Sequence, residues 1–228
     1  MAAGDLTVLG EGIQVQARAI TDRYDETTLA ALRSHLLGLE AFLRSNPKVG
    51  TAEAREELAH ALRLVDAAYA FASELQGFLA QKQHTELASL FDLGSIGVLG
   101  IENVLTAEKP SLVRVLMAAL AEGLVFAASR QYVAGARDLL AVVYRTHAAA
   151  MHRELWALAT DRRKGMTAND VKEVQANIGV FFRKLEANDV PPETRVRILK
   201  EFFVLVLVIR VADLLEALGS AARKPAKS

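Results

Sequence analysis

The chain of 228 residues contains no cysteine, and this absence excludes several kinds of chemistry. Without thiols there is no disulfide bond, no thiolate nucleophile and none of the common structural zinc sites that need cysteine ligands. An excess of charge is lacking too, because 27 basic residues balance 27 acidic residues. The chain as a whole therefore exerts little attraction on a phosphate backbone or an anionic membrane, and binding to either would need a local basic patch.

Long apolar runs are also missing. The longest covers only residues 202–209 and is followed by Arg210, whereas a membrane-spanning helix needs about 20 apolar residues. A second apolar stretch, residues 112–128, is interrupted by Arg114 and Glu122. The first residues lack the basic start and apolar core of a secretory signal. We therefore expect a soluble, cytoplasmic protein without a membrane helix. Scarce Asn and Gln and an excess of Arg over Lys are compatible with a thermophilic source.

Apolar residues at helical spacing are what the chain has in abundance. Five leucines, for example, repeat three and four residues apart, which places them on one face of a helix: Leu29, Leu32, Leu36, Leu39 and Leu43. No alternating strand pattern competes anywhere in the chain. The fold class is therefore all-α, an antiparallel bundle of about seven helices. The second expected helix starts between Asp25 and Thr28 and is stopped by Asn46 and Pro47. The other expected helical segments are residues 13–25, 51–79, 95–105, from 110 onward, 140–158, 167–188 and 192–218.

The organisation expected from this pattern is one helical domain over residues 1–220. The basic tail, residues 221–228, is expected to be disordered. The glycine-rich segment 92–100 is the best candidate for an irregular link of low local stability. The first helix should be short, whereas the C-terminal helix should be long and apolar and should end at Gly219.

Acidic residues and histidines offer only weak candidates for a metal site. Glu57 and His60 stand three residues apart, as in dinuclear iron bundles, but the second such pair that a dinuclear site requires is missing. Glu53, Glu56 and Glu57 could hold Mg²⁺, although acidic residues in a first helical turn also suit the helix dipole. His147 lies on an apolar stripe and is expected in the core. No catalytic residue, cofactor-binding residue or metal ligand is assigned, and no cofactor is expected.

Residues 155–190 resemble a helix-turn-helix, with the basic turn 162–164 followed by a capped helix start at Thr167. One apolar stripe, however, continues through the place where the turn between the two helices should fall. A single helix of about 20 residues accounts for this stripe better, so DNA binding is kept only as an alternative. The stripe consists of Val171, Val174, Ile178, Phe181 and Leu185.

Function has to be argued from apolar helix surface, since no motif for catalysis stands out. The leading hypothesis is a non-enzymatic helical protein that acts through self-association, most simply as a dimer, or through a protein partner. The alternatives are a DNA-binding regulator and a Mg²⁺-dependent all-α nucleotide phosphohydrolase. The run 202–209 is apolar on every face of about two helical turns, so it must be enclosed by its own chain or by a second copy. The interface candidates are Phe202, Phe203, Leu205, Val206, Val208 and Ile209.

Overall fold

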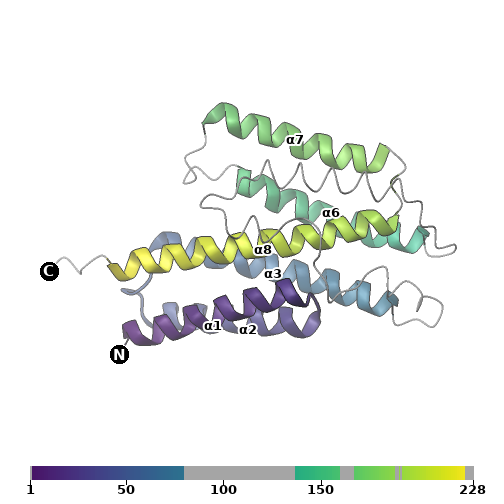
Figure 1. The fold of residues 1–228 in the computed structure, drawn as a ribbon. Helices are drawn as coiled ribbons and strands as arrows, with labels where there is room; N and C mark the ends of the chain where they lie inside the picture. The colour runs from purple at the N-terminus through teal and green to yellow at the C-terminus, as the bar shows by residue number, and fades with distance from the viewer. Residues whose placement is uncertain (1, 80–136, 160–166, 188–189, 191, 224–228) are drawn as a thin grey trace. The chain divides into compact units, whose positions relative to one another are not determined.

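The computed structural model describes residues 2–79, 137–159, 167–187, 190 and 192–223 (Figure 1). In these ranges the chain forms six α-helices and no strand, which confirms the all-α class. The expected link 92–100, the helices expected at 95–105 and from 110 onward, and the end of the tail lie outside the described residues. The helices are α1 (Ala2–Asp22), α2 (Glu26–Ser45), α3 (Ala52–Leu79), α6 (Arg137–Ala159), α7 (Ala168–Ala187) and α8 (Pro192–Arg223).

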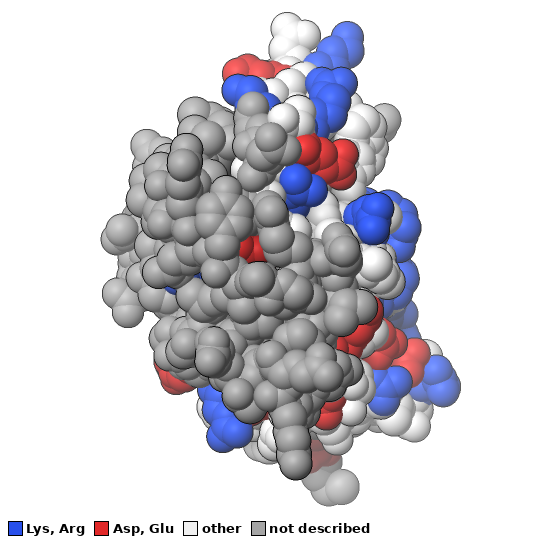
Figure 2. Space-filling view, turned by 90° about the vertical axis from the view of Figure 1, so that its right-hand side faces the viewer, with Lys and Arg blue, Asp and Glu red and all other residues white. Residues whose placement is uncertain are grey.

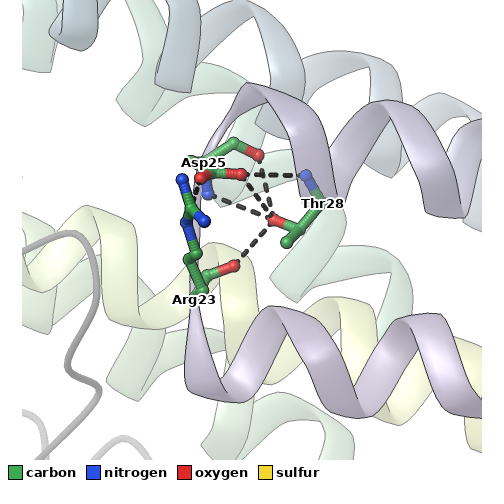
Figure 3. A network of polar contacts seen from close by, with 3 residues as sticks. All are labelled: Arg23, Asp25 and Thr28. Atoms are coloured by element: carbon green, nitrogen blue, oxygen red, sulfur yellow. Dashed lines mark hydrogen bonds and ion pairs between the residues drawn. The ribbon is translucent and has the colours of Figure 1, made fainter.

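Helix α2 begins where a capping box fixes the backbone (Figure 3). Oδ1 of Asp25 accepts a hydrogen bond from the backbone N–H of Thr28 at 2.9 Å, and Oγ1 of Thr28 accepts one from the backbone N–H of Asp25 at 3.2 Å. These bonds satisfy two donors at the helix start. Arg23 adds an ion pair to the Asp25 carboxylate. At the other end the helix stops before Asn46, as the following Pro47 predicted.

Two predicted boundaries were wrong. The first helix is not short, because it begins at Ala2 and has 21 residues. Leu6 is buried and extends the core-facing stripe of Ile13 and Ala17 by a further seven residues, a pattern that the two intervening glycines obscured. The last helix does not end at Gly219 but continues to Arg223. A glycine within a helix costs only about 1 kcal/mol relative to alanine, which the surrounding helix tolerates.

The described residues fall into two compact units, and α8 contributes to both of them. The first unit contains α1, α2, α3 as far as Gly77, and α8 from Phe203 onward. A link of only three residues joins α1 to α2, so the two helices pack side by side and antiparallel (Figure 1). The rings of Tyr24, Phe71 and Phe203 form its aromatic core, with Phe71 and Phe203 stacked at 5.2 Å between centroids. The hydroxyl of Tyr24 donates to the backbone carbonyl of Ala68 at 3.0 Å.

The second unit contains α6, α7 and α8 as far as Phe202. Helices α6 and α7 pack against each other, and the rings of Phe181, Phe182 and Phe202 meet in the core. His147 is buried, which confirms its expected place in the core. Among the described helices none is both long and apolar enough to cross a membrane. The prediction of a single domain over residues 1–220 stays a prediction.

Candidate functional surface

The six residues predicted to form an interface lie in the core of a single chain. None of them is more than 9% exposed. The ring of Phe202 meets Phe181 edge to face at 5.2 Å, and the ring of Phe203 stacks on Phe71. The apolar run of α8 is therefore enclosed without a second copy, because its own chain supplies the cover. This burial applies to all six: Phe202, Phe203, Leu205, Val206, Val208 and Ile209.

The three carboxylates at the start of α3 do not converge on a common site. Glu53 and Glu56 are exposed, whereas Glu57 is buried and lies against Arg210 of α8. Nη1 of Arg210 is 3.5 Å from Oε2 of Glu57. The Glu57 carboxylate, which belongs to both candidate metal sites, thus forms an ion pair with a guanidinium. In the described part of the chain no three His, Asp or Glu side chains are grouped closely enough to hold a metal ion.

The histidines likewise contact groups that do not form a metal site. His60 lies beside the guanidinium of Arg63, with 2.8 Å between Nδ1 and Nη2. His152 stacks on the ring of Trp156 and meets Phe182 edge to face. His60 thus lies beside a cation, and His152 packs among aromatic rings.

Helix α7 runs without interruption from Ala168 to Ala187. Its start follows Thr167, as predicted, and no turn divides it into the two helices that a helix-turn-helix would need. On the face drawn in Figure 2, Lys and Arg side chains alternate with Asp and Glu side chains over the described surface. The described surface that is visible in this view is therefore mixed in charge and not continuously basic.

Buried ionisable groups occur on α8 near its start. Glu201 is 5% exposed, and burial raises its pKa, while the charges of Lys200 and Arg197 oppose part of that rise. In α6 the hydroxyl of Tyr144 is buried without a hydrogen-bond partner among the described residues, and burial raises its pKa as well. The guanidinium of Arg195 lies over the Tyr144 ring at 5.9 Å from its centroid. Burial thus disfavours the charged form of both Glu201 and Tyr144.

Two open hollows lie in the first unit. One, of about 160 Å³, lies between α2 and α3, and its charged groups already have partners. Glu40 pairs with Arg44 at 3.2 Å, and Nη2 of Arg55 donates to the carbonyl oxygens of Leu43 and Pro47. The other, of about 310 Å³, lies between α1 and α8. It is lined by Leu6, Thr7, Gly10, Glu11, Gln14, Leu215, Leu218 and Gly219.

The most distinctive surface feature of the second unit is an apolar stripe on the outside of α6, which we call the α6 stripe. It consists of Val142, Ala149 and Trp156, which are all exposed and recur every seven residues. Residues at this spacing share one face of a helix. Arg145 and Arg153, both exposed, flank the stripe. The α6 stripe is therefore an apolar surface whose exposed charged neighbours are cationic.

A second such feature, the α1 stripe, lies on the outside of α1 in the first unit. Val8 is 68% exposed and Val15 is 60% exposed. The two are one heptad apart, so their directions around the helix differ by only about 20°. They lie on the side of α1 opposite to the buried Ile13, Ala17 and Ile20. This face points outward although Val8 and Val15 are apolar.

Comparison with family models, with curated protein sequences and with solved structures finds no match to this chain. The geometry of the α1 and α6 stripes is therefore the basis for any functional proposal. The two stripes are not evident from apolar periodicity, because this periodicity identifies the face that carries the most apolar residues, which is the core face. A signal was present, since Val8 and Val15 are seven residues apart and out of phase with Ile13 and Ala17.

Proposed function

We propose that this protein is non-enzymatic and acts through association, with a second copy of itself or with a protein partner. The observation that carries this proposal is the pair of outward apolar stripes on α1 and α6. Isolated exposed apolar residues are common on protein surfaces, but heptad-spaced ones on the outer face of a helix match the way that helices pair. The large apolar side chains exposed in the described residues are Val8, Val15, Leu37, Val142, Trp156 and Val180.

The two alternatives gain no support from the described residues. A Mg²⁺-dependent phosphohydrolase needs carboxylates that face one another, and Glu57 is paired with Arg210 instead. A DNA-binding regulator needs a recognition helix preceded by a tight turn; α7 is one continuous helix, and the basic turn 162–164 expected before it lies outside the described residues. Association explains the exposed apolar stripes, which neither alternative requires.

Trp156 provides a direct test, because it is the only tryptophan in the chain and is 43% exposed. Its fluorescence reports whether the α6 stripe becomes covered. If the α6 stripe is the surface that joins two copies, the emission maximum should shift to shorter wavelength as protein concentration rises, and a protein partner that binds the stripe should cause the same shift. Light scattering on the same samples gives the mass, which is 24.7 kDa for one copy.

Two variants make this test specific to the stripe. Val142→Glu puts a charge into the α6 stripe and should reduce the shift, whereas Leu37→Glu changes an exposed apolar residue on α2 and should leave it unchanged. Circular dichroism checks that both variants keep their helices. A mass of one copy at every concentration tested would contradict self-association. An equal response of the two variants would contradict the role of the α6 stripe.

A further inference from the structure

We infer that the α1 stripe is the contact between two copies of this chain, which pair through α1 in antiparallel orientation about a two-fold axis beside Val15. This inference rests on the proposed function and names the partner and the surface. The α1 stripe is open to solvent in one chain, since its two valines are among the most exposed apolar side chains described. A second helix covering it would remove apolar area from water.

Charge complementarity identifies that second helix as another copy of α1. Glu11 and Arg18 are exposed, carry opposite charges and are one heptad apart on the same flank of the α1 stripe. Neither forms an ion pair within the described part of the chain. In a two-fold contact, residue i of one copy meets residue j of the other and residue j meets residue i. An antiparallel pair of α1 helices therefore sets each Glu11 opposite Arg18 of the other copy, twice over.

The register follows from this pairing. If Glu11 lies opposite Arg18 of the second copy, the two-fold axis passes between residues 14 and 15. The two Val15 side chains then meet at the axis. The two Val8 side chains lie far apart, about 20 Å along the helix axis, because each faces position 21 of the other copy. One register thus brings the apolar centre and both ion pairs together.

The α6 stripe does not offer the same match. Its exposed flanking charges, Arg145 and Arg153, have the same sign, so no pairing of two α6 helices can set them against opposite charges from the same positions. The sign pattern therefore favours α1 over α6 as the contact between identical copies. Because the contact uses one helix from each copy, its area is small and the dimer should be weak and reversible.

Single-cysteine variants test the register directly, because the chain has no cysteine of its own. Val15→Cys should form a disulfide-linked dimer under mild oxidation, whereas the matched variant Val8→Cys should not. A disulfide cannot form when the two Cα atoms are more than about 7 Å apart. Both positions are similarly exposed, so random collisions would link both variants to the same extent. Equal linking of the two variants, or none in either, would overturn the register.

A charge exchange tests the ion pairs. Glu11→Lys and Arg18→Glu should each raise the dissociation constant about tenfold, since each places like charges opposite one another twice. The double variant should restore the wild-type value, and a mixture of the two single variants should form a heterodimer. Sedimentation velocity measures the dissociation constant of each single variant, of the double variant and of the mixture. If neither single change weakens the dimer, or the double variant does not recover, the inference fails.

These outcomes separate this inference from the proposed function. If light scattering finds a dimer that none of the α1 variants affects, the proposed association stands and the α1 contact is wrong. If the dimer forms through α1, mass doubles while the Trp156 emission stays constant, because α6 is not covered. A monomer at all concentrations would contradict both self-association and the α1 contact.

Discussion

Arg210 of α8 and Glu57 of α3 form a buried ion pair, 3.5 Å apart, in which neither side chain is more than 2% exposed. Nε and Nη2 of Arg210 find no hydrogen-bond partner among the described residues. Two charges taken out of water at this separation compensate each other only in part. The pair therefore links α3 to α8, since removing either side chain takes away one charge of a buried ion pair.

We expect Arg210→Met to lower the free energy of unfolding by about 3–5 kcal/mol, because it removes the guanidinium from a buried ion pair and leaves the Glu57 carboxylate buried. Adding Glu57→Leu should recover most of this loss, since the double variant buries no charge. Urea denaturation at pH 7 followed by circular dichroism measures both. If the double variant is as unstable as Arg210→Met alone, packing of the guanidinium and not its charge would explain the loss.

The capping box of α2 predicts a pH-dependent contribution to stability. Burial alone would raise the pKa of Asp25, but the hydrogen bonds from Thr28 and the charge of Arg23 together lower it. A lowered pKa in the folded state means that the carboxylate stabilises the fold above its unfolded pKa, about 3.9, and that this contribution is lost as pH falls through the folded pKa.

Asp25→Ala should therefore cost about 1 kcal/mol at pH 7 and less at pH 3. Asp25→Asn keeps a capping oxygen but does not titrate. At pH 7 it should lower the free energy of unfolding by less than Asp25→Ala does, and its difference from wild type should shrink at acid pH. Urea denaturation at the two pH values gives these differences. A cost of Asp25→Ala that is the same at both would rule out the contribution of the charge.

Glu201 predicts the opposite dependence on pH. Its raised pKa means that the neutral acid is favoured in the folded state, so ionisation weakens the fold as pH rises through the folded pKa. Glu201→Gln removes this ionisation, and the variant should gain stability relative to wild type as pH rises from 4 to 8. The difference in unfolding free energy between the two proteins, followed across that range, measures the effect. A difference that does not change with pH would show that Glu201 is not strained by burial.

Two helical glycines should respond differently to alanine. At Gly179 of α7 an added Cβ meets nothing within 4 Å, so Gly179→Ala should stabilise the protein by roughly 0.4–1 kcal/mol. At Gly12 of α1 the Cβ would lie 2.8 Å from Cδ2 of His35, whose Nδ1 lies 2.9 Å from the backbone carbonyl oxygen of Ala31. Gly12→Ala should gain less or lose stability, because the imidazole must move. Thermal unfolding of both variants tests this, and an equal gain would show that α1 and α2 are not in close contact there.

Local signals in the sequence predict each helix of the described residues, although not every helix end. The leucine stripe of α2 predicts its core face, and Asp25 and Pro47 predict its two ends, because caps and proline act within a few residues. The same reasoning failed at Gly219. A glycine ends a helix in this way only where its backbone adopts the left-handed conformation, and at Gly219 the helix continues to Arg223.

Sequence alone also established that residues 202–209 must be enclosed, because they are apolar on all sides of the helix. Only the tertiary structure decided that one chain encloses them, that Glu57 turns inward to Arg210, and that Val8 and Val15 face outward. Periodicity states which residues share a helix face. It does not state which surface covers that face, since the cover comes from helices far away in the chain, whose packing depends on all their contacts together.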